Sequence, residues 1–228
     1  MSNILIFAPH FDDESIACGG TIIGHVRQKD DISVIFMTSG NSGSISHQKL
    51  NEVEYGNLRR AEASEALKVL GIPKQFECLE LDEGFMYSTP ELEKLLVTMI
   101  RRKKPDIVYV PHENENHNDH IVTNIAVTKA VQRANWKYFP SLGMKPHQVS
   151  EIRAYEVWTP LQRPNLYVDI TPVISLKEKA IDCYQSQLIH HKYHHAIIGL
   201  NRYRGIMGAS VDFAEAFRTE YPLTIRGH

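Results

Sequence analysis

The strongest constraint on the fold is a series of short, largely apolar segments that alternate with helical patterns, and the first of them is a continuous apolar run. These segments are Asn3–Ala8, Asp31–Thr38, Phe76–Leu81 and Asp106–Val110. Strands that are apolar along their whole length are buried on both faces, which is typical of parallel sheets covered by helices. Two later segments, Tyr155–Thr159 and Leu166–Ile170, are also predicted to be strands.

Helical patterns fill the intervals between the apolar segments. They cover about Asp13–Gln28, Glu52–Leu70, Pro90–Lys104, Asp119–Arg133 and Ile174–Gln187. Gly71 is a typical helix stop, and Pro90 stands in a first helical turn, where proline is favoured. Because strands and helices alternate and no shift in composition marks a second domain, we expect residues 1–228 to form one α/β domain. The predicted architecture is a three-layer, Rossmann-like fold with a mostly parallel sheet.

Composition narrows the classes of function. The 228 residues carry a formal net charge of -2, without the basic stripe that nucleic-acid binding requires. No apolar run is long enough to span a bilayer, and the short run before Pro9 does not resemble a signal peptide. Cys18, Cys78 and Cys183 are widely spaced, which suits a reducing compartment. We therefore expect a cytoplasmic protein with a small-molecule partner, without nucleic acid and without a membrane span.

Two segments rich in histidine and carboxylate follow the first and fourth predicted strands. They are His10–Glu14 and His112–His120. Because binding sites of open α/β sheets lie beyond the carboxyl ends of the strands, these segments should lie close together. Imidazole and carboxylate suit zinc or ferrous iron, and a catalytic zinc takes three protein ligands and leaves a position for water. The candidate ligands, among which spacing does not select three, are His10, Asp12, Asp13, His117, Asp119 and His120.

Each segment also has a structural explanation when it is taken alone. Asp12, Asp13 and Glu14 could be first-turn acids that the helix dipole favours. His117 and His120 could be exposed loop residues. The presence of both segments, each directly after a buried strand, favours a shared metal site.

The two segments resemble the signatures of a known family. Ala8-Pro9-His10-Phe11-Asp12-Asp13-Glu14 is similar to the Ala-His-Pro-Asp-Asp-Glu signature of the LmbE-like, or PIG-L, N-acetylglucosamine deacetylases, with the proline placed before the histidine. His117-Asn118-Asp119-His120 resembles the family's His-Pro-Asp-His, with asparagine in place of proline. Arg59–Glu62 and Tyr167–Thr171 resemble further family blocks, so the similarity extends over nearly the whole chain.

The resemblance implies a zinc-dependent hydrolase that removes an acetyl group from an N-acetylated sugar of the GlcNAc type. By position, His10, Asp13 and His120 would hold the metal, which would be zinc or, alternatively, ferrous iron. Asp12 would be the general base that activates water at the metal.

Further roles follow from the same resemblance. His117 would steady the oxyanion and could protonate the leaving amine, and Asp119 would orient the ring of His117. Arg59 would contact the sugar, whereas Glu14 is expected to be structural. The family often assembles, which makes a homo-oligomer an expectation.

Three other functions remain as alternatives. An amidase of a thiol–sugar conjugate would use the same metal residues with a different substrate pocket. A non-haem iron oxygenase could use His10, Asp12 and a distant histidine, but such sites usually lie on β-rich scaffolds. A non-catalytic Rossmann-like binding module predicts a glycine-rich turn after the first strand, where this chain is acidic.

Overall fold

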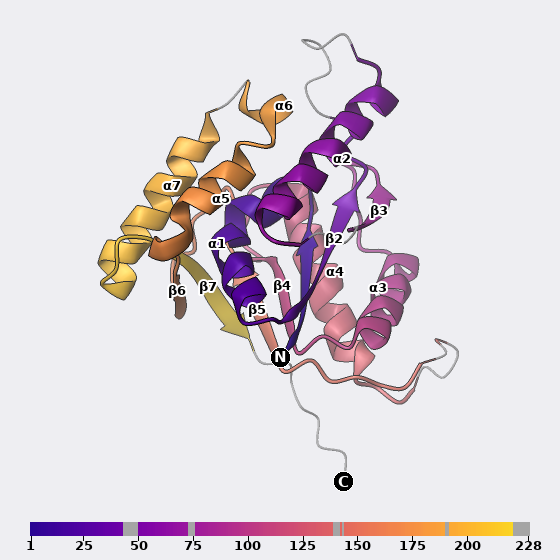
Figure 1. Ribbon diagram of the computed structural model, residues 1–228. Helices are drawn as coiled ribbons and strands as arrows, with labels where there is room; N and C mark the ends of the chain where they lie inside the picture. Colours follow the sequence, from indigo (N-terminus) through magenta and orange to yellow (C-terminus); the bar gives the residue numbers. More distant parts are fainter. Residues whose placement is uncertain (43–49, 73–75, 139–141, 143, 190–191, 221–228) are drawn as a thin grey trace.

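A mostly parallel sheet is the frame of the fold. The computed structural model describes residues 1–42, 50–72, 76–138, 142, 144–189 and 192–220. The strands are β1 (Asn3–Ala8), β2 (Asp31–Thr38), β3 (Glu77–Leu81), β4 (Ile107–Pro111), β5 (Glu151–Tyr155), β6 (Leu166–Asp169) and β7 (Ala214–Glu220). They form a seven-stranded sheet in the order β3-β2-β1-β4-β5-β7-β6 (Figure 1). Only β7 runs antiparallel to its neighbours β5 and β6, so the predicted sheet is confirmed.

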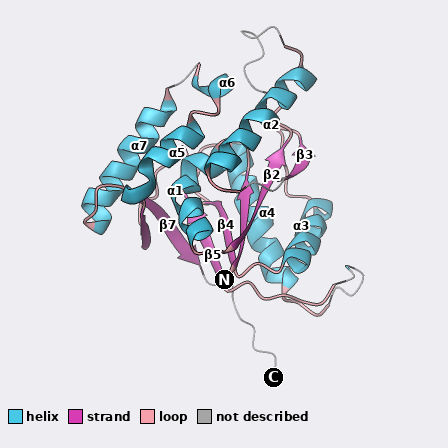
Figure 2. Cartoon of the chain, viewed as in Figure 1, coloured by secondary structure: helices cyan, strands magenta, loops and turns pink. Residues whose placement is uncertain are grey.

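Helices cover both faces of the sheet and complete three layers (Figure 2). One face carries α1 (Asp13–Arg27), α2 (Glu52–Val69) and α5 (Ile174–Ile181). The other face carries α3 (Pro90–Lys103) and α4 (Asn118–Ala134). The C-terminal part adds α6 (Gln185–Leu188), which contacts α2, and α7 (Tyr193–Arg204), which packs on β7. A 3-10 turn at Thr171–Val173 and a π-helical turn at Gly205–Ala209 flank these helices.

The central strand β1 explains why its sequence is continuously apolar. Successive residues of a strand point to opposite faces of the sheet. Ile4 and Ile6 belong to the core beneath α1, α2 and α5, whereas Leu5 and Phe7 belong to the core beneath α3 and α4. All four side chains are buried, so both faces of the strand require apolar residues.

Two predicted elements differ in the structure. The strand expected at Tyr155–Thr159 instead occupies Glu151–Tyr155. The backbone N–H groups of residues 157, 158 and 159 donate to the buried carboxylate of Glu115, so they do not serve a neighbouring strand. The single helix expected over Ile174–Gln187 is divided into α5 and α6.

The cysteines and the helices bear on two further expectations. Cys18, Cys78 and Cys183 are all free. Cys18 is buried, as expected of a small apolar side chain, whereas the other two are partly exposed. Among the described residues, no helix has both the length and the apolar character needed to cross a membrane.

A buried carboxylate joins the C-terminal strand to the first helix. Glu215 of β7 accepts hydrogen bonds from the backbone N–H groups of Gly20 and Thr21, both at 2.8 Å. It also accepts the Thr21 hydroxyl at 2.5 Å and pairs with Lys177 of α5 at 2.7 Å. A Cβ atom on Gly20 would lie 2.4 Å from the Ile170 side chain, so only glycine allows this approach. The result is a clamp on α1.

Replacement of Glu215 by alanine should destabilise the fold strongly. The variant leaves Lys177 buried without a counter-charge, and removal of one partner of a buried ion pair costs about 3–5 kcal/mol. The urea midpoint of unfolding, followed by far-UV circular dichroism, should fall accordingly. The matched control is Glu65→Ala, which removes the exposed Lys68–Glu65 pair and should leave the midpoint nearly unchanged. Equal midpoints for the two variants would contradict the clamp.

Candidate active site

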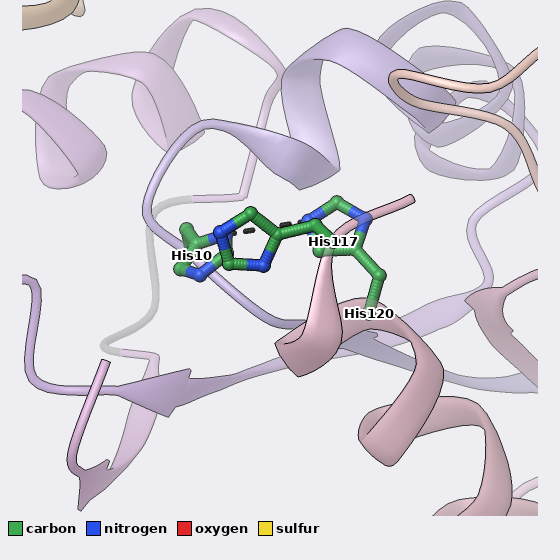
Figure 3. A group of neighbouring side chains, drawn as sticks. All are labelled: His10, His117 and His120. Atoms are coloured by element: carbon green, nitrogen blue, oxygen red, sulfur yellow. Dashed lines mark hydrogen bonds between the residues drawn. The ribbon is translucent and has the colours of Figure 1, made fainter. Parts of the chain in front are cut away.

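The two predicted segments meet at the carboxyl edge of the sheet. β1 pairs in parallel with β4, with Ile4 opposite Ile107 and Ile6 opposite Tyr109. The loop from β1 to α1 and the loop from β4 to α4 therefore leave the same edge. Figure 3 shows the consequence, because the rings of His10, His117 and His120 lie together although they come from distant parts of the chain.

Three side-chain atoms form a compact triangle at this edge. His10 Nδ1 and His120 Nε2 lie 3.3 Å apart. Asp13 Oδ2 lies 3.4 Å from each of these two nitrogens. In a tetrahedral zinc site with bonds of about 2.0–2.1 Å, two ligand atoms are separated by about 3.3–3.4 Å. These atoms thus have the spacing of three ligands that share one ion.

His117 offers a second way to complete a metal site. A ligand nitrogen from each of His10, His117 and His120 lies within 4.8 Å of the others. His117 is partly exposed and caps α4, and its Nδ1 accepts the backbone N–H of Asp119 at 3.3 Å. The three-histidine set is wider than the triangle that contains Asp13, so we favour the triangle on geometric grounds.

The charges and unpaired atoms of the cluster fit a bound cation. Asp13 Oδ1 and His120 Nδ1 are buried, and neither has a hydrogen-bond partner among the residues that the structure describes. Burial acts to raise the pKa of Asp13, but the imidazoles of His120 and His10 hold it well below its ordinary value. Burial acts to lower the pKa of His10, but the carboxylates of Asp119 and Asp13 raise it to about 10. A buried carboxylate is costly without compensation, which a divalent ion would supply.

Asp12 lies next to the triangle in a rare backbone conformation. Its φ of 134° and ψ of -26° are values that residues other than glycine adopt only when their surroundings impose them. Its Oδ2 accepts a hydrogen bond from the Tyr193 hydroxyl at 3.0 Å. Burial raises the pKa of Asp12 to about 8, against the influence of the Arg59 guanidinium. Backbone strain and perturbed carboxyl pKa values concentrate at functional sites, which singles out Asp12.

Arg59 of α2 supports the backbone at Asp12. The side chain is 2% exposed. Nη2 donates to the carbonyl oxygen of Phe11 and lies 3.8 Å from Asp12 Oδ2. Nη1 donates to Glu83 Oε1 at 3.4 Å. The contact of Arg59 with a sugar stays a prediction, and the contacts described here place the guanidinium against the protein itself.

The carboxylate of Asp119 contacts His10 instead of His117. Its Oδ2 lies 3.0 Å from His10 Nε2 and accepts the backbone N–H of Gly84 at 2.7 Å. Asp119 is expected to orient the ring of His117. In the structure the contact with that ring comes from the backbone N–H of Asp119, which donates to His117 Nδ1, and not from the carboxylate. A carboxylate on the outer nitrogen of an imidazole is the usual support of a metal-bound histidine. Asp119 therefore fixes the ring of His10, whose other nitrogen belongs to the triangle.

Two residues of the site, Glu83 and Tyr193, have no counterpart in the sequence-based prediction. Glu83 contacts Arg59 and follows β3 at the same edge of the sheet, so its position after a strand was an available signal. Tyr193 comes from the distant C-terminal part and carries no motif, and Tyr184 from the same part of the chain packs near the site. The Tyr184 hydroxyl donates to Glu14 Oε1 at 2.6 Å, which accords with a structural role for Glu14.

Comparison with known proteins points to the same family as the motifs. The profile of the PIG-L family, described as GlcNAc-PI de-N-acetylase, matches residues 5–131 and so includes both metal motifs. The chain belongs to the PIG-L family. A Thermococcus kodakarensis relative of this PIG-L chain, diacetylchitobiose deacetylase, is 28% identical over 194 residues, which cover 82% of this chain and 70% of the relative.

Another relative and a solved structure extend the comparison. The 1D-myo-inositol 2-acetamido-2-deoxy-alpha-D-glucopyranoside deacetylase of Mycobacterium sp. (strain KMS) is 29% identical over 163 residues. The match covers 59% of this chain and 51% of the relative, so it spans about half the length of that protein. N,N'-diacetylchitobiose deacetylase from Pyrococcus horikoshii, solved with its inhibitor MPG, matches with a TM-score of 0.86 and 27% identity over 96% of this chain and 84% of its own. The PIG-L fold is therefore shared along nearly the whole chain.

The backbone strain at Asp12 can be measured without reference to activity. In the interior of a helix or strand, a variant with glycine is less stable than the variant with alanine by about 0.5–1 kcal/mol. At the positive φ of Asp12 the order should reverse, with Asp12→Gly more stable than Asp12→Ala by about 1 kcal/mol or more. Urea unfolding in the presence of chelator gives the difference without a contribution from metal binding. The matched pair Asn57→Gly and Asn57→Ala, at an exposed position inside α2, should show the ordinary order. A more stable alanine variant at position 12 would exclude the strain.

Proposed function

We propose that this chain is a metal-dependent hydrolase that removes the acetyl group from an N-acetylated sugar. The observation that carries the proposal is the triangle of ligand atoms from His10, Asp13 and His120, with Asp12 as the adjoining carboxylate. Relatives that are named deacetylases of acetylated sugars support the substrate class.

We assign the metal to His10 Nδ1, Asp13 Oδ2 and His120 Nε2, with zinc as the resident ion and ferrous iron as the alternative. The spacing of these atoms and the carboxylate of Asp119 behind His10 support this choice. When bound, the ion would lower the pKa of a water molecule toward about 7 and polarise the amide carbonyl. The carboxyl group of Asp12, whose pKa burial raises, would be ionised beside such a charge.

Asp12 would take the proton from the attacking water. The Tyr193 hydroxyl occupies Asp12 Oδ2, so Oδ1 is the oxygen that would receive this proton. His117 would steady the oxyanion and give a proton to the leaving amine. Burial and the neighbouring His10 and His120 lower the pKa of His117, which suits a group that must release a proton. Arg59, whose contact with the sugar is part of this proposal, would also hold the backbone of the base in place.

The amidase of a thiol–sugar conjugate is the nearest alternative, because it would use the same metal residues. It would release a carboxylic acid larger than acetate, so the product separates the two activities. Deacetylation is favoured because it is the named activity of the relatives. We also propose a cytoplasmic location, which the free and widely spaced cysteines support, and a homo-oligomeric assembly.

The zinc content of single variants should identify the ligands. Asp13→Ala and His120→Ala should each lose bound zinc, because each removes a direct ligand, whereas His117→Ala should keep it. Elemental analysis after dialysis against metal-free buffer gives the occupancy. His147→Ala, near the C-terminal end of α4, is the control for loss of a histidine outside the site. Loss of zinc from His117→Ala with retention in Asp13→Ala would replace the triangle by the three-histidine set.

Asp12→Asn should keep the metal and lose turnover. The amide cannot accept a proton, so kcat for acetate release should fall about 10²–10⁴-fold. Acetate release from N-acetylglucosamine and N,N'-diacetylchitobiose, with and without chelator, is the measurement. Glu65→Gln is the control for neutralising an exposed acid. A parent rate in Asp12→Asn would exclude the base role, and no acetate from any N-acetylated sugar would shift weight to the conjugate amidase.

A further inference from the structure

An exposed tryptophan lies beyond the proposed catalytic base. The Tyr193 hydroxyl donates to Asp12 Oδ2 at 3.0 Å. The ring of Tyr193 meets the ring of Trp158 edge to face, with centroids 5.4 Å apart and planes at 87°. Asp12 is buried, Tyr193 is partly exposed, and Trp158 is 38% exposed. The three side chains therefore form a path from the proposed site toward solvent.

Two buried carboxylates fix the segment that presents Trp158. Glu115 accepts the backbone N–H of Trp158 at 3.0 Å and those of its two neighbours at 2.8 and 3.1 Å. Glu156 accepts the backbone N–H of Leu161 at 2.7 Å and pairs with Arg204 through contacts of 3.0 and 2.7 Å. The exposed indole thus stands on a backbone that is held on both sides. A rigid aromatic side chain loses little entropy when it binds a ligand.

The chemistry of the site selects what this indole would bind. A pyranose ring presents an apolar face of C–H groups that packs on an aromatic ring, while its hydroxyl groups stay hydrated. Tyr193 stands between Asp12 and Trp158. A sugar whose acetamide reaches Asp12 would lie against Tyr193, and the sugar unit linked to it would lie against Trp158.

We propose that Trp158 binds the sugar unit next to the one that is deacetylated. The substrate class is then an N-acetylated disaccharide or a longer neutral sugar chain, in preference to a monosaccharide. This inference rests on the proposed deacetylase function and adds to it the length of the substrate and a residue that selects it.

Kinetics of Trp158→Ala on two substrates test this assignment. With N,N'-diacetylchitobiose, KM should rise about tenfold while kcat changes by less than about twofold, because the contact is equal in the bound substrate and the transition state. With N-acetylglucosamine, both constants should stay at the parent values. Trp158→Phe keeps an aromatic face and should recover most of the affinity for the disaccharide, which separates a lost contact from a misfolded segment.

The chain offers a matched control, because it contains only two tryptophans. Trp136 is 37% exposed and lies just past the C-terminal end of α4, away from His117 and His120 at the other end. Trp136→Ala should leave KM for both substrates unchanged.

Fluorescence gives a readout that does not depend on turnover. In an Asp12→Asn background, Trp136→Phe leaves Trp158 as the sole tryptophan, and its emission should change saturably with N,N'-diacetylchitobiose. The counterpart with Trp158→Phe retains only Trp136 and should not respond.

The outcomes separate this inference from the function on which it rests. An equal rise in KM for both substrates, an unchanged KM for the disaccharide or a silent Trp158 would overturn the role of Trp158 and leave the deacetylase function in place. Absence of acetate release from any N-acetylated sugar by the parent protein would refute the proposed function, and the inference with it.

Discussion

The parallel pairing of β1 with β4 is the contact on which the rest of the structure depends. It places the two loops that carry the histidines and carboxylates at one edge of the sheet. A slip of one residue in β1 would move one loop by about 3.3 Å relative to the other and would exchange the faces to which Ile4 and Leu5 point. That displacement equals the 3.3 Å between His10 Nδ1 and His120 Nε2. The packing of two apolar cores against β1 therefore also sets the geometry of the proposed metal site.

The site concentrates unfavourable features that the surrounding fold must stabilise. Asp12, Asp13 and Glu14 are three successive buried carboxylates, and the first has a strained backbone. Each is held from a different direction. Tyr193 contacts the side chain of Asp12, the two imidazoles contact Asp13, and Tyr184 contacts Glu14. Arg59 places a buried positive charge beside these three carboxylates, and a divalent ion would supply the further positive charge that balances them. The strain is local, but its support comes from α2 and from the C-terminal part.

Whether a feature could be predicted from the sequence depends on whether its interactions are local or join distant segments of the chain. The apolar run of β1 and the histidine spacing are local patterns, so the parallel sheet and the cluster of His10 with His120 could be predicted. The strand β5 was placed four residues too late because its apolar continuation is bound by Glu115, a contact between distant segments that no periodicity reveals. Tyr193 was missed for the same reason. The contact of the Asp119 carboxylate with His10 could not be predicted either, because it depends on the pairing of two strands and not on distance along the chain.

The proposed metal ligands and the residues proposed to bind the neighbouring sugar lie in different parts of the chain, which has a consequence for how substrates are selected. The family profile ends at residue 131, and every proposed metal ligand lies before that point. Trp158 and Tyr193 lie after that residue. The hydrogen bonds of Glu215 tie β7 to α1, which follows the loop that carries His10. In the proposed function, water activation depends on the triangle of His10, Asp13 and His120, whose geometry tolerates little change. The proposed contacts with the neighbouring sugar come from the loop that carries Trp158 and from the start of α7, both of which can vary without moving the proposed ligands. We therefore expect residues outside the family profile, together with Arg59, to determine which acetylated sugar this chain accepts.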